Sequence, residues 1–329
     1  MLGLQDILAA RRKLSGLITR TPLEYSFLLS QRAGCEVYLK LESWQKTGSF
    51  KVRGAINKIS NLTEEEKASG LVTASAGNHA LGVAYASRAL GNVPTTVFVP
   101  VNAPVSKLEK LEEFECEVLL SGNSYDEAHH AAEDFERAHS ATYVHAYDDP
   151  LTIAGQGTVG LEILEDLPEA EAILVPVGGG GLITGVAVAA KAINPQVQVI
   201  GVQPEASPSA YLSLRDGRPY EEYDAAPTIA DGLAGGFGRL PFGIASDLID
   251  EIVLVSEEET RAAVFTLLEL AQLVVEGSGA VGIAALLASK VNLAGRKVVA
   301  VLTGANIDAG LLFEIMSEQL NSHNSHCRG

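Results

Sequence analysis

The sequence predicts an α/β protein in which parallel sheets are flanked by helices. Three observations lead to this prediction: strand-like and helix-like segments alternate, the strand-like segments are continuous apolar runs, and the chain has 329 residues, of which 47% are hydrophobic. Alternating strands and helices are typical of parallel sheets. Continuous apolar strands are expected where both faces of a sheet are covered. A chain of this length suits two lobes or one large α/β unit.

The predicted strands are short runs rich in Val, Ile, Leu and Ala. In chain order they lie at residues 36–42, 71–75, 95–100, 116–120, 141–146, 172–177, 197–204, 251–256 and 297–304. The predicted helices carry apolar residues at helical spacing and lie at residues 1–18, 51–62, 77–90, 125–139, 181–193 and 257–272. Residues 203–243 are rich in Pro, Gly and charge, which predicts loops near a site or an interface.

Composition restricts the possible partners. The chain has 24 Lys and Arg against 41 Asp and Glu, a net charge of −17, which argues against nucleic acid or an anionic membrane surface. Cys35, Cys116 and Cys327 form no pattern typical of a zinc site or a disulfide framework. Asp6 interrupts the amphipathic N-terminal segment, so no export signal is expected, and no apolar stretch is long enough to span a membrane. A cytoplasmic location is expected.

Lys51 follows a glycine–serine turn and begins a predicted amphipathic helix, which Thr47 or Ser49 could cap. The positive potential of a helix N-terminus disfavours an ammonium there. A lysine shifted towards its neutral amine is a nucleophile. The alternative interpretation is an ordinary exposed surface lysine.

Three turns from a strand into a helix have features of anion sites. Residues 178–181 are four successive glycines at a predicted helix N-terminus, where free amides and the helix dipole attract a compact phosphate. They match neither a Walker A loop nor a dinucleotide motif, although a structural glycine turn would explain them equally well. The second turn, residues 75–79, adds polar side chains suited to a carboxylate, and the third comprises residues 303–306.

Seven motifs, read in order, resemble those of the fold-type II pyridoxal-phosphate enzymes, specifically the threonine/serine dehydratases (ammonia-lyases). They are SFKVRGA (49–55), SAGNHA (75–80), DDPLTIAGQGT (148–158), GGGGL (178–182), TIADGL (228–233), EGSGA (276–280) and TGANID (303–308). The resemblance covers nearly the whole chain. It implies the two-lobed fold of the tryptophan synthase beta type, with residues 1–46 and 148–329 in a large cofactor-binding domain and 47–147 in a small mobile domain. The sequence lacks the regulatory module of biosynthetic threonine dehydratases and so resembles the short catabolic form.

The resemblance also implies roles by position, with pyridoxal 5′-phosphate as the cofactor. Lys51 would form the Schiff base and act as catalytic base, Asn78 would bind the phenolic oxygen, and Thr303 would face the pyridine nitrogen. The implied cofactor-binding residues are Phe50, Lys51, Asn78, Gly178, Gly179, Gly180, Gly181, Leu182, Glu276 and Thr303. The implied substrate-binding residues are Ser75, Ala76, Gly77, Asn78 and His79.

The function implied by the resemblance is elimination of water from L-threonine or L-serine, which yields a 2-oxo acid and ammonia. Another β-hydroxy amino acid, such as 3-hydroxyaspartate, remains an alternative substrate, with Arg239 as a possible partner for a second carboxylate. Serine racemase is a second alternative, but Ala76 stands where racemases carry a serine base. Gln203 and Ser209 replace the racemases' metal-binding acids, so no metal site of that kind is expected.

A protein that only binds amino acids on the same scaffold is the alternative outside enzymes, and retention of Lys51 argues against it. The resemblance implies a homodimer or homotetramer. The sequence leaves open the physiological substrate, the effectors and the origin of the acidity. Ala305 departs from the family's usual glycine, which affects how Thr303 is placed.

Overall fold

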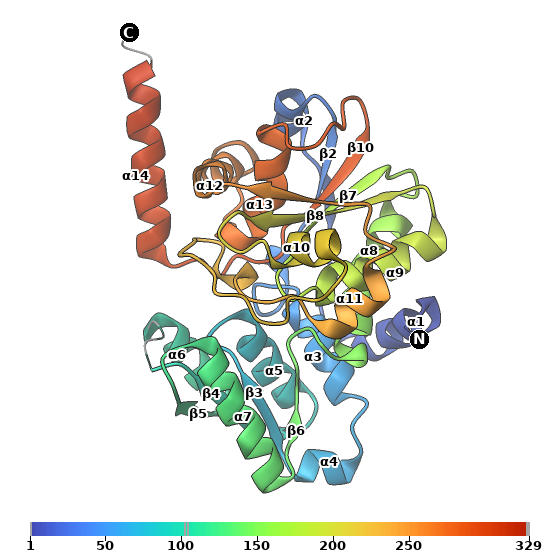
Figure 1. Cartoon of the computed structure of the whole chain (residues 1–329), viewed down its shortest axis with the longest axis vertical. Helices are drawn as coiled ribbons and strands as arrows, with labels where there is room; N and C mark the ends of the chain where they lie inside the picture. The colour runs from blue at the N-terminus through green and yellow to red at the C-terminus, as the bar shows by residue number, and fades with distance from the viewer. Residues whose placement is uncertain (1, 102, 104, 327–329) are drawn as a thin grey trace.

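The computed structural model describes residues 2–101, 103 and 105–326, and these fold around two sheets. Figure 1 shows the larger sheet with its helices in the upper part of the molecule and the smaller sheet in the lower part. Residues 23–40 and 172–301 supply the strands of the larger sheet, and residues 71–143 supply those of the smaller one. The domain boundaries predicted at residues 47 and 147 remain a prediction.

Within the described residues the larger sheet has six strands in the order β1-β2-β10-β7-β8-β9. Its strands are β1 (Leu23–Tyr25), β2 (Glu36–Lys40), β7 (Ala172–Pro176), β8 (Gln198–Pro204), β9 (Glu251–Val255) and β10 (Lys297–Val301). The smaller sheet has the order β5-β4-β3-β6, built from β3 (Leu71–Ala74), β4 (Thr95–Val99), β5 (Glu117–Leu120) and β6 (Thr142–Tyr143). Neighbouring strands are parallel except for β1, which pairs with β2 antiparallel at the edge.

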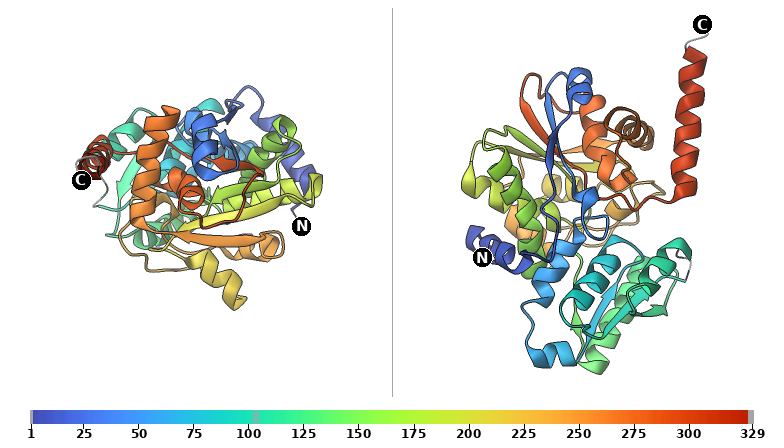
Figure 2. Two further views of the ribbon diagram at one scale, coloured as in Figure 1. Left: turned by 90° about the horizontal axis from the view of Figure 1, so that it is seen from above. Right: turned by 180° about the vertical axis from the view of Figure 1, so that it is seen from behind.

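Helices connect the strands of both sheets. The helices of the first half are α1 (Leu4–Leu14), α2 (Phe27–Ala33), η1 (Glu42–Trp44), α3 (Lys51–Ile59), α4 (Glu64–Ala68), α5 (Asn78–Ala89), α6 (Val105–Glu112) and α7 (Tyr125–His139). Those of the second half are α8 (Pro150–Asp166), α9 (Gly181–Ile193), α10 (Ser209–Asp216), η2 (Asp231–Leu233), α11 (Arg239–Ala245), α12 (Glu257–Ala271), α13 (Gly277–Leu287) and α14 (Ala309–His326). The end of α14 extends away from the body in both Figure 1 and Figure 2.

Both faces of the larger sheet are buried, as the apolar strands predict. Along β7, Ala172 and Leu174 pack into the core formed with α2, α12 and α13. Ile173 and Val175 point to the other face and pack against α8 and α9. The smaller sheet is likewise covered by α7 on one face and by α3, α5 and α6 on the other. This double covering confirms the predicted α/β class with helices flanking mostly parallel sheets.

Several elements of the described chain differ from the sequence prediction. The helices α2, α4, α6, α8, α10, α11, α13 and α14 were not among those predicted. Of these, α8 and α13 are buried on nearly all sides, so their sequences show no amphipathic spacing. The edge strand β1 is too short to show a period, and it was not predicted. The strand expected over residues 141–146 is confined to Thr142 and Tyr143. Beyond them the chain forms a turn, in which the backbone N–H groups of Tyr147 and Asp148 donate to His145 Nδ1 at 3.3 and 2.8 Å. Within the described residues, no helix is both long and apolar enough to cross a membrane.

Glycines allow α8 and α9 to pack with their backbones in contact. A Cβ at Gly185 would lie 2.5 Å from the nitrogen of Gly157 and 2.5 Å from the carbonyl oxygen of Ile153. Backbone atoms cannot rotate away as a flexible side chain can. The close approach of these helices therefore depends on glycine at this position.

We expect Gly185→Ala to lower the free energy of unfolding by about 1–3 kcal/mol, because the added methyl group overpacks the α8–α9 contact. Gly282→Ala is the matched control, since a Cβ there meets its nearest neighbours at 3.7 Å, an ordinary contact distance. Gly282 lies inside α13, so alanine should leave stability unchanged or raise it by about 0.4–1 kcal/mol. Urea unfolding of both variants measures the difference, and equal stabilities would refute the packing argument.

Candidate active site

A cavity of about 360 Å³ lies where the two sheets meet. Its walls include the turns that follow β3, β7 and β10, at the carboxyl ends of the strands, where open α/β sheets bind ligands. All of the site residues predicted from the sequence line this cavity: Phe50, Lys51, Ser75, Ala76, Gly77, Asn78, His79, Gly178, Gly179, Gly180, Gly181, Leu182, Glu276 and Thr303. Segments more than two hundred residues apart in the chain thus contribute to one site.

Lys51 is the first residue of α3, and its side chain lines the cavity. The Nζ atom donates a hydrogen bond to the carbonyl oxygen of Ala146 at 3.2 Å. Burial lowers the pKa of Lys51 to about 8, although the nearby carboxylate of Glu276 acts in the opposite direction. At pH 7 about a tenth of this amine is therefore uncharged, far more than in an ordinary lysine.

The expected capping of α3 by Thr47 or Ser49 was wrong. Phe50 occupies the N-cap position, and the hydroxyls of Thr47 and Ser49 are buried without a hydrogen-bond partner among the described residues. Backbone contacts with the turn after β10 hold this segment instead. Phe50 N donates to Thr303 O at 3.1 Å, and Ser49 forms an isolated bridge with Gly304.

The glycine loop connects β7 to α9. Gly180 has a φ of +95°, which favours glycine, and it is the N-cap of α9. Within the described part of the chain no side chain caps this helix. A Cβ at Gly179 would lie 2.3 Å from the ring of Tyr147, and one at Gly180 would lie 2.4 Å from Phe237. The loop thus brings the uncapped N–H groups of α9 to the cavity wall, an arrangement that binds anions.

The loop after β3 begins α5 in a similar way. Gly77 is the N-cap, without a side-chain cap among the described residues, and its N–H donates to Ser75 Oγ at 3.1 Å. His79 is almost fully buried, with Nε2 2.8 Å from the carbonyl oxygen of Val144. Burial, followed by the charge of Lys51, lowers the pKa of His79 to about 3, so its imidazole is neutral at physiological pH. Its Nδ1 has no hydrogen-bond partner within the described chain.

Asn78, Glu276 and Asn306 form a hydrogen-bond network across the cavity. Asn78 Nδ2 donates to Glu276 Oε1 at 2.7 Å, and Asn306 Nδ2 donates to Asn78 Oδ1 at 2.7 Å. The backbone N–H of Asn306 donates to Glu276 Oε2 at 3.1 Å, and Asn306 Nδ2 also reaches the carbonyl oxygen of Thr47 at 2.8 Å. The side chain of Asn78 therefore does not cap its own helix. It contacts the opposite wall instead.

Sequence reasoning missed several residues that line the cavity. They are Lys110, Tyr147, Asp231 and Ser278. Ser278 Oγ accepts a hydrogen bond from Gly232 N at 2.9 Å and fixes the loop 231–236 at the cavity. Asp231 and Ser278 lie inside quoted motifs, which was the available signal, whereas Tyr147 only borders one. Asn306 belongs to the turn 303–306 that the sequence singled out, although its hydrogen bonds were not predicted.

No group of three or more His, Cys, Asp or Glu side chains in the described residues is arranged to hold a metal ion. Gln203, at one of the positions compared with the racemases' metal site, is fully buried. Its side chain accepts a hydrogen bond from Tyr211 N at 3.0 Å and donates one to Val177 O at 3.2 Å. Ser209, the other compared position, is also buried. Of the three cysteines, Cys35 and Cys116 are free thiols, and Cys327 lies outside the described residues.

Lys51 should react with an amine-selective acylating reagent at a lower pH than an ordinary lysine, because only the uncharged amine reacts. Labelling of the cofactor-free protein, followed by mass spectrometry of the Lys51 peptide, should be half-maximal near pH 8. An ordinary lysine has a pKa of about 10.4. In Glu276→Gln the midpoint should fall further, because the carboxylate that stabilises the ammonium is gone. A midpoint that rises in this variant would contradict the assigned electrostatics.

Comparisons with known proteins agree with one another. A family model described as "Pyridoxal-phosphate dependent enzyme" matches residues 14–304. The chain is 50% identical over 321 residues to an L-threonine ammonia-lyase of Thermotoga maritima, covering 97% of this chain and 79% of the relative. It is 41% identical over 316 residues to the catabolic L-threonine dehydratase TdcB of Escherichia coli, covering 95% of each.

A solved structure of maize serine racemase has a TM-score of 0.89 to this chain at 34% identity, covering 98% of this chain and 99% of the racemase. The family match spans most of the chain, and the identities with the two lyases are well above the level at which fold and family are shared. The chain therefore belongs to the pyridoxal-phosphate-dependent enzymes, in the group that contains the threonine ammonia-lyases.

Proposed function

We propose that this enzyme eliminates water from L-threonine or L-serine and releases the corresponding 2-oxo acid and ammonia. The single observation that carries the proposal is the position of Lys51, a lysine with a lowered pKa in a cavity that also contains an uncapped helix N-terminus. The names of the lyase relatives, at 41% and 50% identity, support the choice of substrate.

The residues of the cavity fit pyridoxal phosphate. Two groups support this fit: the glycine cradle at the start of α9, which side chains would fill, and the amine of Lys51. The backbone amides of residues 178–182 would hold the phosphate, and Lys51 would hold the aldehyde carbon. Asn78 would bind the phenolic oxygen, Thr303 would face the ring nitrogen, and Phe50 would flank the ring. When bound, the cofactor supplies an electron sink for negative charge at the Cα atom of the amino acid.

Each side chain has a separate task in this proposal. The uncharged amine of Lys51 removes the Cα proton at close range. The N–H groups at the start of α5, in residues 75–79, bind and orient the substrate carboxylate. Thr303 offers the ring nitrogen a hydroxyl, which is too weak an acid to protonate it, and this favours elimination over transamination. Glu276 keeps Asn78 oriented through their hydrogen bond.

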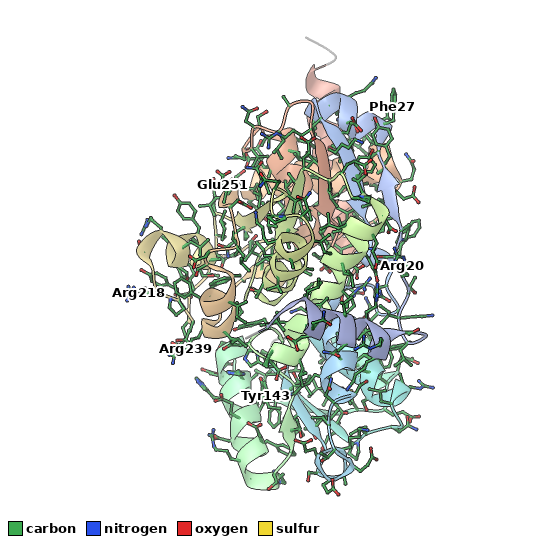
Figure 3. All side chains as sticks on the ribbon, turned by 90° about the vertical axis from the view of Figure 1, so that its right-hand side faces the viewer. Arg20, Phe27, Tyr143, Arg218, Arg239 and Glu251 are labelled. Atoms are coloured by element: carbon green, nitrogen blue, oxygen red, sulfur yellow. The ribbon has the colours of Figure 1, made fainter. Side chains whose placement is uncertain are left out.

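The cavity favours a neutral side chain on the substrate over 3-hydroxyaspartate. The guanidinium of Arg239 is 77% exposed and binds Glu221 at 2.8 Å, so its charge is already engaged (Figure 3). Glu221 itself lines the cavity, where it would repel a second carboxylate. Lys110 also lines the cavity, but its Nζ donates a hydrogen bond to Asn306 Oδ1 at 3.3 Å.

We also propose that the protein is a cytoplasmic homodimer or homotetramer and that residues 47–147 move as a small domain. The separate four-stranded sheet supports a mobile domain. Tyr25, Phe27 and Leu28 expose apolar side chains on and beside the edge strand β1, which supports self-association. Figure 3 shows Phe27 at the surface of the upper part of the molecule.

Purified enzyme should release 2-oxobutanoate and ammonia from L-threonine, and pyruvate and ammonia from L-serine. Lys51→Ala should abolish this activity, because it removes the amine that would hold the cofactor and act as the base, while circular dichroism shows an unchanged fold. A coupled assay over a panel of β-hydroxy amino acids measures the substrate preference. Turnover of 3-hydroxyaspartate above that of both substrates, or near-normal turnover by Lys51→Ala, would refute the proposal.

Ala76 should restrict the enzyme to elimination, because its methyl group cannot deliver a proton. The native enzyme should convert L-serine to pyruvate with little D-serine, and Ala76→Ser should raise the ratio of D-serine to pyruvate. Chiral chromatography of the products measures this ratio. Ala76→Val is the control that changes size without adding a proton donor, and an equal rise in both variants would contradict a role for the hydroxyl.

A further inference from the structure

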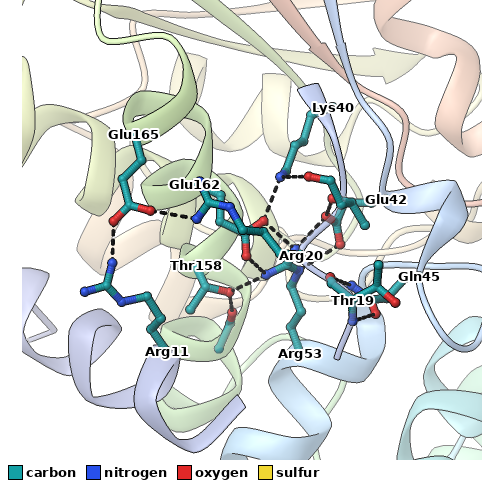
Figure 4. A network of polar contacts seen from close by, with 12 residues as sticks. Arg11, Thr19, Arg20, Lys40, Glu42, Gln45, Arg53, Thr158, Glu162 and Glu165 are labelled. Atoms are coloured by element: carbon teal, nitrogen blue, oxygen red, sulfur yellow. Dashed lines mark hydrogen bonds and ion pairs between the residues drawn. The ribbon is translucent and has the colours of Figure 1, made fainter. Parts of the chain in front are cut away.

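Arg53 lies two residues after Lys51 in the first turn of α3 and is fully buried. Residues two apart in a helix do not share a face. Lys51 accordingly lines the cavity, whereas Arg53 extends towards α8 and the end of β2 (Figure 4). A buried guanidinium beside the proposed catalytic lysine is not used by the mechanism above.

Every N–H of the Arg53 guanidinium has a partner. Nε donates to Glu42 Oε2 at 2.8 Å, and Nη2 donates to Glu42 Oε1 at 2.8 Å. Nη2 also donates to Glu162 Oε2, and Nη1 to Glu162 Oε1, each at 2.8 Å. The remaining N–H of Nη1 donates to Thr158 Oγ1 at 3.0 Å. The two carboxylates therefore hold the planar group in a double fork that fixes its position and its rotation.

Lys40 completes the charge balance of this buried group. Its Nζ donates to Glu162 Oε2 at 2.6 Å and to the carbonyl oxygen of Thr21 at 2.7 Å. Two cations thus face two carboxylates. Burial by itself would raise the pKa of Glu42, but Arg53 outweighs it and holds this pKa below its usual value. Because the group is neutral as a whole, it adds no net charge near Lys51.

The partners of Arg53 belong to segments associated with the larger sheet. Glu42 follows β2, and Thr158 and Glu162 lie on α8. The backbone also approaches α8 closely here, since a Cβ at Gly155 would lie 2.5 Å from Arg53 O. The opposite side of α3 packs against the smaller sheet through Val52 and its neighbours. The double fork therefore joins the first turn of α3 to the larger sheet, independently of its contacts with the smaller one.

Stability alone is a poor explanation for this arrangement. Removing two ion pairs from water costs about as much as their attraction returns, and apolar replacements of such groups are often neutral or stabilising. An apolar cluster, however, would not fix the orientation of α3 relative to α8. A rotation or shift of α3 would break both forks, and it would move Lys51 relative to the glycine loop.

We propose that Arg53 is a positioning residue for Lys51, and that Glu42 and Glu162 act through it to fix the first turn of α3 at the cavity. This inference rests on the proposed role of Lys51. An error of about 1 Å in a reacting group reduces rates by as much as about a hundredfold. Loss of the double fork should therefore reduce kcat more than it changes KM.

The test compares Arg53→Lys with two controls in the holoenzyme. A single ammonium retains the charge but cannot make two forks. Lys40→Met disturbs the same buried charges without touching α3, so it controls for lost stability. Arg20→Ala removes exposed ion pairs with Glu165 and Asp166 on the same α8. Three readouts are taken: kcat and KM for L-threonine, the circular dichroism of the bound cofactor, and the thermal midpoint of the cofactor-free protein.

Arg53→Lys should lower kcat about tenfold or more, change KM less than about threefold and weaken the cofactor dichroism. Lys40→Met should lower the thermal midpoint at least as much, yet keep kcat within about threefold and leave the dichroism unchanged. Arg20→Ala should match the native enzyme in all three readouts. Native kcat and dichroism in Arg53→Lys, or an equal loss of both in Lys40→Met, would overturn the proposal.

If Arg53→Lys does not fold, a second variant tests the proposal. Thr158→Val removes the hydrogen bond that Thr158 Oγ1 accepts from Arg53 Nη1 and the one that it donates to Gly155 O within α8. Lowered kcat and dichroism in a folded protein support positioning, and native values overturn it. Failure of the proposed function is distinguishable. If the native enzyme turns over no β-hydroxy amino acid, that function is wrong, whereas the dichroism of added pyridoxal phosphate still measures how Lys51 is held.

Discussion

The desolvation of one ammonium group is the constraint on which the site depends. Lys51 is placed in the first turn of a helix and its side chain lies within a cavity, and both conditions disfavour its charge. Glu276 partly offsets the effect, so the amine has a pKa near 8 and remains able to carry or release a proton. Around this amine the chain arranges helix N-termini, which attract anions, and a neutral histidine. The electrostatics of the cavity thus favour a ligand that brings its own negative groups and a carbonyl carbon.

Close backbone packing makes this cavity possible. Glycines on α8 and α9 allow these helices to touch, and α3 packs as closely against α8 at Arg53 and Gly155. Such contacts resist small shifts, because backbone atoms cannot adjust as side chains do. The glycine loop after β7 and the lysine at the start of α3 are therefore held at a defined separation by rigid elements. A site built on rigid elements has less freedom to lose when a ligand binds.

Membership of the pyridoxal-phosphate family indicates which cofactor the protein uses. Individual side chains in the cavity determine which reaction of an amino acid is favoured. This chain, whose curated relatives include L-threonine ammonia-lyases, has nearly the same fold as maize serine racemase, with a TM-score of 0.89. Fold similarity alone consequently does not separate the two activities. The difference that the proposed function relies on is local: Ala76 lacks a titratable group, and Gln203 uses its side chain for internal hydrogen bonds.

The sequence by itself determined the α/β class, most of the strands, the glycine loop at Gly178 and the candidate lysine, because these depend on local spacing and residue type. It missed several helices, the buried α8 and α13 among them, as well as the antiparallel edge strand β1, and it suggested the wrong cap for α3. Only the tertiary structure decided that Asn306 bridges Asn78 and Glu276, and that Arg53 holds Glu42 and Glu162 in a double fork. The physical reason is that these partners lie 11 to 228 residues apart in the chain. Such separations leave no periodic pattern in the sequence, and the pairing follows from how the two sheets and their helices pack.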